Sequence, residues 1–308
     1  MRAAIIFFLC GILTVAKAQL PERFIVILGI VQDAGYPQIG CDKQCCRAYW
    51  DGKEKKKHVT CLALVDRSSN QYWLFEATPD INEQLHSLQP YLTTKNDYTP
   101  DGIFLTHAHI GHYSGLMQFG REAMGASSIN VFVMPRMDSF LRNNGPWSQL
   151  VDLKNIKLQK LQADSSIHLN TSISVTPIRV PHRDEFSETV GFIIETDKKK
   201  ILFIPDIDKW EKWGRDIITE ISKVDMALID GTFYKAGELP GRNMSEVPHP
   251  FVEESMKKFA SLPAKERSKI TFIHFNHTNP LLKKNSAEKD KVRSAGFAVA
   301  EEEMLISL

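Results

Sequence analysis

The stretch that decides the fold is Ile103-Phe104-Leu105-Thr106-His107-Ala108-His109-Ile110-Gly111-His112, a short hydrophobic strand that runs into three histidines. Residues two apart in an extended segment point the same way, so His107 and His109 can bind one ion. Gly111 allows a sharp turn that brings His112 round to the same cavity. Because neutral imidazole is a good zinc ligand, this stretch predicts a metal site at the end of a strand.

Further candidate ligands occur near the ends of predicted strands farther along the chain. These are His182 after residues 173–180, Asp206 after residues 201–204, and His274 within residues 270–275. Taken alone, each is an ordinary buried or surface polar residue. Their shared placement predicts that they join the first histidines, with His277 as an alternative to His274.

Strands and helices alternate along the rest of the chain, and this pattern predicts layered α+β structure around sheets. Helices are expected from Thr78-Pro79 onward, over 116–124 and 210–222, and from Ser286 to Gly296. The remaining predicted strands cover residues 24–31, 61–65, 72–75, 102–105, 129–134, 190–195 and 226–229.

The first residues have the pattern of a secretory signal peptide. Arg2 precedes an apolar run from Ala3 to Leu13, which is too short to span a bilayer, and Ala16-Lys17-Ala18 is typical of a cleavage site. We expect residues 1–18 to be removed before Gln19. Residues 19–308 then form a single domain that is periplasmic or secreted.

The composition is that of a globular protein, with 43% hydrophobic and 24% charged residues. The 38 basic residues nearly balance the 37 acidic ones, so the charge gives no reason to expect a nucleic-acid or membrane partner. A small-molecule substrate is expected, and the sequence leaves the oligomeric state open.

The order of these ligands, HxHxxH followed by a histidine, an aspartate and a histidine, resembles the metallo-β-lactamase superfamily over essentially the whole mature chain. The resemblance implies an αββα sandwich with the metal site along one edge between two sheets. By position, the first metal would be bound by His107, His109 and His182. The second would be bound by His112 and His274, and Asp206 would bridge the two.

A second resemblance is to one branch of that superfamily, the pyrroloquinoline quinone biosynthesis protein B (PqqB) branch. It is carried by residues 77–81 (ATPDI), 230–232 (DGT) and above all 273–280 (IHFNHTNP), which favours His274 over His277. Cys41 and Cys46 match two cysteines of that branch's CxCxxC. The branch lacks the leading HxH pair, so the combination implies a PqqB-like scaffold with a hydrolase site.

The sequence departs from the superfamily motif HxHxDH at one position, because the second-metal aspartate falls at Gly111. A lost carboxylate weakens the binding of a cation. We therefore expect one tightly bound zinc ion and a second that is weak or absent. On this reasoning, Gly111→Asp should raise the metal content toward two.

The predicted chemistry is hydrolysis, with Asp206 and His112 as the catalytic residues. Three neutral histidines leave the zinc charge undiminished, which lowers the pKa of a bound water and gives hydroxide at ordinary pH. Asp206 can bridge the metals or orient this water. Carboxylates that can fix the histidine tautomers are Glu76, Asp80 and Asp230.

Cys41, Cys45 and Cys46 lie close together in the sequence. They predict a structural zinc site, with a further ligand such as His58, or alternatively a disulfide or free thiols.

Three functions are consistent with these residues. The first is an exported metal-dependent hydrolase of an ester, lactam or phosphodiester bond. The second is a PqqB-like oxidoreductase of cofactor biosynthesis with iron in the site, since the ligand types suit iron as well as zinc. The third is a non-catalytic binding protein. Specificity is expected in loops 143–151 and 233–250, where Arg242 and His249 can meet an anionic substrate.

Overall fold

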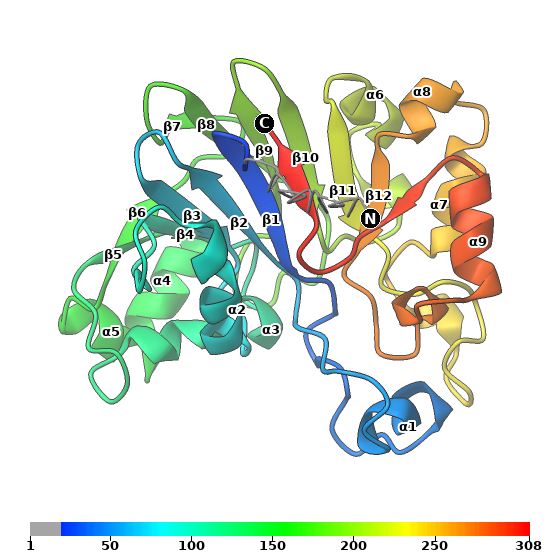
Figure 1. The fold of residues 1–308 in the computed structure, drawn as a ribbon, viewed down its shortest axis with the longest axis horizontal. Coiled ribbons are helices and arrows are strands. Elements are labelled where there is room, and N and C mark those ends of the chain that lie inside the picture. The colour runs from blue at the N-terminus through cyan, green and yellow to red at the C-terminus, as the bar shows by residue number, and fades with distance from the viewer. Residues whose placement is uncertain (1–19) are drawn as a thin grey trace, which may run out of the picture.

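The computed structural model describes residues 20–308, which form two seven-stranded sheets with helices on the outer side of each (Figure 1). The predicted αββα sandwich is therefore confirmed. The predicted signal peptide lies outside the described residues. Within those residues, no helix is long and apolar enough to cross a membrane.

The first sheet has the strand order β14-β1-β2-β3-β4-β5-β6. Strands β1 to β3 pair antiparallel, and β3 to β6 pair parallel. Its strands are β1 (Arg23–Gly29), β2 (Cys61–Asp66), β3 (Gln71–Phe75), β4 (Gly102–Phe104), β5 (Ile129–Val133), β6 (Ile156–Lys160) and β14 (Leu305–Ser307).

The second sheet repeats this plan, with antiparallel pairs from β7 to β10 and parallel pairs from β10 to β13. Its strands are β7 (Ile167–His168), β8 (Ile173–Arg179), β9 (Val190–Thr196), β10 (Lys200–Ile204), β11 (Met226–Asp230), β12 (Ile270–Ile273) and β13 (Ala298–Val299).

Helices cover the outer face of each sheet (Figure 1). The α-helices are α1 (Gln44–Trp50), α2 (Ile81–Leu88), α3 (Ile110–Tyr113), α4 (Pro135–Asn143), α5 (Trp147–Asp152), α6 (Ile217–Ser222), α7 (Val252–Phe259), α8 (Ala264–Arg267) and α9 (Ala287–Ser294). The short 3-10 helices are η1 (Gln89–Tyr91), η2 (Ser114–Phe119), η3 (Trp210–Lys212), η4 (Met244–Glu246) and η5 (Pro280–Leu282).

An aromatic cluster joins the two sheets next to the histidine motif. The Phe75 ring lies 4.9 Å from Phe104 of the same sheet, and 5.4 and 6.3 Å from Phe192 and Phe203 of the other sheet. All four side chains are fully buried. Offset and edge-to-face packing of this kind stabilises the fold beyond simple burial, so the strands beneath the site are held rigidly.

Two predicted helices are wrong. Residues 116–124 form the end of η2 followed by turns rather than one helix. The predicted helix 210–222 is interrupted between η3 and α6, where Gly214 lies and where the side chain of Asp216 caps the new helix. The final helix is confirmed, because Ser286 accepts from the backbone of Lys289 and Gly296 has φ 89°.

Candidate metal centre

The site lies at one edge of the sandwich because parallel strands of both sheets end there. Glu76 follows β3 and Thr106 lies two residues past β4, while Asp206 follows β10 and His274 follows β12. The carboxyl ends of neighbouring parallel strands point to the same edge, so residues from distant parts of the sequence meet.

A first group of side chains comes together as the sequence predicts. His107, His109, His182 and Asp206 each offer one ligand atom, and these atoms all lie within 4.8 Å of one another. The shortest distance, 2.7 Å, joins His107 Nε2 to His109 Nδ1. His182 Nε2 lies 3.3 Å from Asp206 Oδ2. Three nitrogens and one carboxylate are a common zinc ligand set.

Hydrogen bonds to the other ring nitrogens indicate which nitrogen of each histidine faces the cavity. Thr106 Oγ1 donates to Glu76 Oε1 over 2.6 Å, so it must accept from His107 Nδ1, which lies 2.9 Å away. This leaves the lone pair of His107 on Nε2. His109 Nε2 lies 3.3 Å from Glu185 Oε2, which leaves its lone pair on Nδ1.

These two lone pairs face each other over 2.7 Å, an arrangement that repels unless a cation or a proton lies between them. Burial lowers the pKa of His107 well below its ordinary value and also lowers that of His109, so both rings favour the neutral form that binds metal. The residues present therefore fit a metal ion.

A second group shares Asp206 with the first and contains Asp33, His112 and His274. Asp33 Oδ1 lies 2.9 Å from His112 Nε2 and 3.3 Å from His274 Nε2. His274, rather than His277, is thus the last histidine of this centre. Asp33 was not predicted from the sequence, although it lies in the turn between Gly29 and Gly35.

In the second group, as in the first, a carboxylate accepts from a threonine hydroxyl, and this hydroxyl lies beside a histidine Nδ1. Thr232 Oγ1 donates to Asp230 Oδ1 over 2.7 Å and lies 3.0 Å from His274 Nδ1, so the His274 lone pair is on Nε2. Three carboxylates were expected to fix the histidine tautomers. Two of them, Asp230 and Glu76, do so through a threonine. Asp80 does not; its side chain accepts from Val59 N and pairs with Lys56.

His249 also reaches the centre, from the loop that precedes α7. Its Nδ1 lies 2.9 Å from Asp230 Oδ2 and 3.1 Å from Asp206 Oδ1. Although burial opposes its charge, Asp230 and Asp206 raise the pKa of His249 to about 10. Arg242 lies on the same loop but is exposed, and its backbone N–H donates to Leu239.

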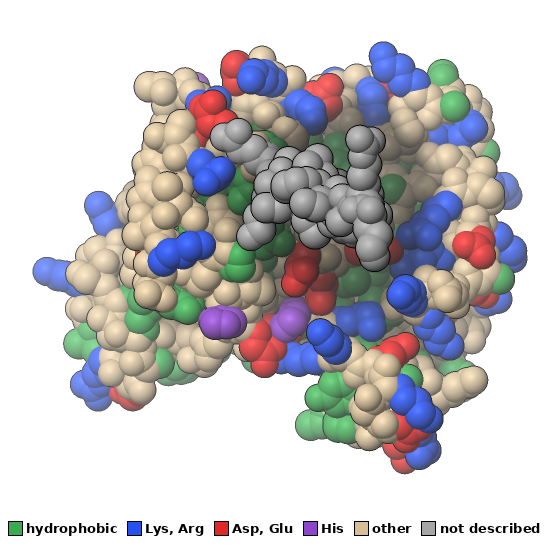
Figure 2. All heavy atoms as spheres, in the orientation of Figure 1, with side chains coloured by type: hydrophobic (Ala, Val, Ile, Leu, Met, Phe, Trp, Pro, Cys, Tyr) green, Lys and Arg blue, Asp and Glu red, His purple; other side chains and the backbone are tan. Residues whose placement is uncertain are grey.

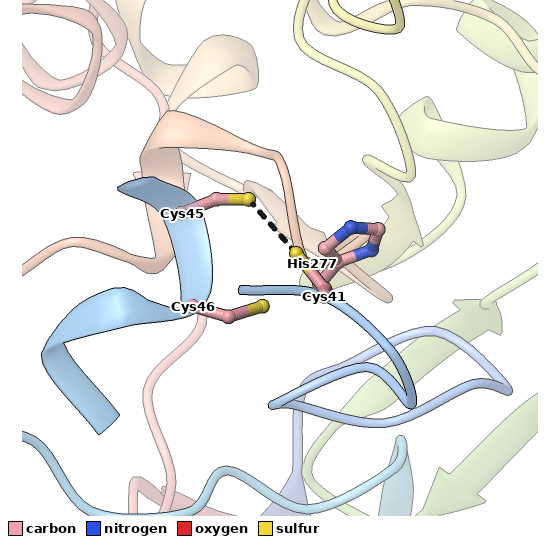
Figure 3. A group of neighbouring side chains, drawn as sticks. All are labelled: Cys41, Cys45, Cys46 and His277. Carbon is pink, nitrogen blue, oxygen red and sulfur yellow. Dashed lines mark hydrogen bonds between the residues drawn. The ribbon is translucent and has the colours of Figure 1, made fainter. Parts of the chain in front are cut away.

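The early cysteines form a separate cluster with a histidine from the far end of the chain. Cys41, Cys45, Cys46 and His277 each place a ligand atom within 4.8 Å of the others (Figure 3). Cys41 Sγ and Cys45 Sγ are 3.5 Å apart, which is a thiol contact and not the roughly 2.05 Å bond of a disulfide. Three sulfurs and one imidazole match a structural zinc site.

His58 was the expected fourth ligand of this cluster, and that prediction is wrong. Its ring nitrogens lie 2.8 Å from Glu83 and 3.1 Å from Glu302, which occupy it fully. His277 is the fourth residue of the cluster instead. It lies four residues after the end of β12, in the segment that also carries His274. Cys61 is buried in β2, where its sulfur approaches backbone carbonyl groups.

The cluster lies in a small lobe around α1 that projects from the body of the molecule (Figures 1 and 2). Within the lobe, Trp50 Nε1 donates to Cys41 O and Tyr36 Oη donates to Glu54. The Trp50 side chain is nonetheless 56% exposed, and Ile39 is 94% exposed. Tyr36 and Cys46 are buried, but the lobe leaves Trp50 and Ile39 exposed, so a bound metal ion would add to its stability.

We expect Cys45→Ser to remove about one zinc ion per chain and to lower the melting temperature, since a hydroxyl is a much poorer zinc ligand than a thiolate. Elemental analysis and thermal unfolding measure both effects. Cys61→Ala is the matched control, because it removes a thiol outside the cluster and should leave the zinc content unchanged. Equal zinc in both variants would contradict a metal in the lobe.

The sandwich and the His/Asp edge together define a metal-binding protein of the αββα class. A model of the family described as the beta-lactamase superfamily domain matches residues 72–275, and the chain belongs to this family.

Within the superfamily, the resemblance to the PqqB branch is confirmed. Coenzyme PQQ synthesis protein B of Methylorubrum extorquens (strain PA1) is 24% identical over 306 residues, covering 92% of this chain and 99% of the relative.

Two solved structures share the fold. Zn(2+)-bound PqqB from Methylobacterium extorquens is similar with a TM-score of 0.77 and 22% identity, over 92% of this chain and 100% of that one. A diphosphatase from the PhnP family has a TM-score of 0.61 and 18% identity, over 93% and 98% of the two chains.

Proposed function

We propose that this protein is a metal-dependent hydrolase that cleaves an ester, lactam or phosphodiester bond of a small molecule. The observation that carries the proposal is the complete first ligand group, His107, His109, His182 and Asp206, in which the lone pairs of His107 and His109 face each other over 2.7 Å. Zinc is the proposed metal, and the zinc-bound PqqB structure supports it.

A zinc ion held there would supply Lewis acidity and a water molecule of lowered pKa. Asp206 is placed to accept a hydrogen bond from this water and to orient it toward the substrate. Burial opposes ionisation of Asp206, but His182 and His249 hold the pKa of its carboxyl well below the ordinary value. It is therefore an anion at neutral pH and an acceptor throughout the reaction.

His249 is placed to donate a proton to the leaving group. Its Nδ1 is directed at Asp206 and Asp230, which leaves Nε2 for the substrate. The ring lies 5.4 Å from that of His182, so it borders the centre without belonging to the first group. This role differs from the anion contact proposed from the sequence.

Two exposed hydrophobic side chains flank His109 and suit a substrate with an apolar group near the cleaved bond. Ile110 is 62% exposed and Phe186 is 60% exposed. Phe186 directly follows Glu185, whose carboxylate contacts His109, so both hydrophobic residues lie beside the ligands. We also propose that the protein is exported, on the pattern of residues 2–18.

A second candidate function is an iron-dependent oxidoreductase of cofactor biosynthesis. The observation in its favour is the similarity to coenzyme PQQ synthesis protein B over 92% of the chain. The site does not distinguish the metals by ligand type alone. Elemental analysis of protein purified without added metal separates the two, because oxidation predicts iron in addition to the zinc of the cysteine cluster, whereas hydrolysis predicts zinc without iron.

The hydrolase proposal is tested with a panel of esters, lactones, β-lactams and phosphodiesters, assayed with the zinc-loaded protein and with the chelated protein. We expect turnover in at least one class and its loss on chelation. Zinc-loaded protein that turns over none of the four classes, while retaining its full metal content, would overturn the proposal.

A further inference from the structure

We infer that the carboxylate missing from the histidine motif has moved to another part of the chain, and that Asp33 binds the second metal ion in its place. The inference deepens the proposed function and rests on it for the identity of the ions. It makes this a two-metal centre whose second ligand set is Asp33, His112, Asp206 and His274.

The geometry of Gly111 carries the first step. A Cβ atom added at Gly111 would lie 2.4 Å from the Cα of Asp33, 2.6 Å from its Cβ and 2.9 Å from its Cγ. The space that a side chain at position 111 would occupy is thus already filled by Asp33. Gly111 does not have a positive φ, so the glycine is needed for this close approach and not for its backbone conformation.

The position of Asp33 carries the second step. Its side chain is only 13% exposed, and Oδ1 approaches the Nε2 atoms of both His112 and His274. Nε2 of His274 carries the lone pair, because Nδ1 is hydrogen-bonded to Thr232. One carboxylate oxygen beside two imidazole nitrogens, with Asp206 opposite, is a ligand set and not a simple ion pair.

Backbone hydrogen bonds hold the turn with Asp33 against the segment that follows β12 and bears His274. Gln32 N donates to Phe275 O over 2.9 Å, and Phe275 N donates to Ile30 O over 2.8 Å. The turn with Asp33 therefore moves together with the segment that bears the last histidine. This pairing gives a fixed ligand on a rigid support, as metal sites require.

The expectation that Gly111→Asp adds a ligand is consequently wrong, because the new side chain would collide with the Asp33 backbone. Removing the Asp33 side chain would not relieve this collision, because the Asp33 Cα itself lies 2.4 Å from the added Cβ. The test is therefore made at position 33. Asp33→Asn keeps the shape of the side chain but removes its charge, whereas Asp33→Cys supplies a thiolate, which is a zinc ligand of similar reach.

The experiment is metal stoichiometry by elemental analysis after dialysis against a weak chelator, with folding checked by circular dichroism. We expect Asp33→Ala and Asp33→Asn to lose about one zinc ion per chain, with affinity at least about 100-fold weaker. Asp33→Cys should retain the ion, because its thiolate can bind zinc from the same position. Asp152→Ala, which removes an exposed carboxylate at the end of α5 that belongs to no ligand group, is the control with unchanged zinc.

The outcomes separate this inference from the proposed hydrolysis. Loss of the ion in Asp33→Asn and its retention in Asp33→Cys support Asp33 as a ligand even if no substrate on the panel is cleaved. An unchanged zinc content in a folded Asp33→Asn or Asp33→Ala would overturn the inference, even in an active hydrolase. Loss of the ion in Asp33→Cys as well as in Asp33→Asn would mean that Asp33 only pairs with His112, and this would also overturn it.

Discussion

Replacing His109 with alanine should abolish hydrolysis and release the ion of the first group. His109 supplies one of three nitrogens directed at that ion, and its Nδ1 lies only 2.7 Å from Nε2 of His107. Metal ions typically contribute several kcal/mol to transition-state stabilisation. A loss of that size corresponds to a fall in kcat/KM of roughly 1,000-fold or more. The same result is expected for His107→Ala.

The measurement is zinc content together with kcat/KM on whichever substrate the panel identifies. His168→Ala is the matched control, since His168 is exposed on β7, and it should change neither quantity. The cysteine cluster should keep its own ion in all three variants. Retained turnover in His109→Ala, with unchanged zinc, would refute the assignment of the first group.

The fold was predictable because its signals are local. Hydrophobic runs such as 201–204 and 226–229 identify buried parallel strands without any knowledge of their partners. Helices were harder to predict. α4 begins at Pro135 and has buried Met137 and Leu141 on one face, but its mean hydropathy is low and nothing in the sequence required a helix there. Trp210 of η3 donates a hydrogen bond from Nε1 to Ser255 Oγ of α7, which is a tertiary contact that the sequence pattern does not show.

The histidine ligands were predictable from spacing and from resemblance, but two site residues were not. Asp33 lies 79 residues before His112, and only the pairing of its turn with Phe275 brings it to the centre. His249 reaches the centre from a loop without regular spacing. A glycine in place of the motif's aspartate was the one available signal, and it indicated a lost ligand when the structure indicates a displaced one.

The exchange of His58 for His277 has a similar cause. His58 lies 12 residues after Cys46 in the sequence, whereas His277 lies 231 residues after it, and the resemblance does not fix the fourth ligand. In the structure, Glu83 and Glu302 contact both ring nitrogens of His58, so His58 has no nitrogen left for a metal ion. His277 has no such carboxylate pair, and it follows His274 by three residues. One short segment after β12 thus contributes to both clusters.

Asp206 belongs to both ligand groups and also contacts His249, so its replacement should have a larger effect than that of any other carboxylate in the centre. Asp206→Asn keeps the shape of the side chain but removes its charge and one of its acceptor oxygens. Its NH2 group would also face His182 Nε2 or His249 Nδ1, which lie 3.3 and 3.1 Å from the present oxygens. We expect some metal to remain and kcat to fall at least about 100-fold, because an amide is uncharged and is a weaker acceptor for the hydrogen bond that orients the water.

Zinc content and kcat are measured in three aspartate variants that lie at increasing distance from the metal centre. Asp208→Asn removes the carboxylate 3.2 Å from His182 Nδ1, and the expected cost is roughly 10- to 100-fold in metal affinity through the orientation of that ring. Asp197→Asn lies in the exposed turn before β10 and should have no effect. The order Asp206, Asp208, Asp197 follows from distance to the shared centre. Full turnover in Asp206→Asn would mean that this carboxylate only holds the fold together, and it would contradict its role in orienting the water.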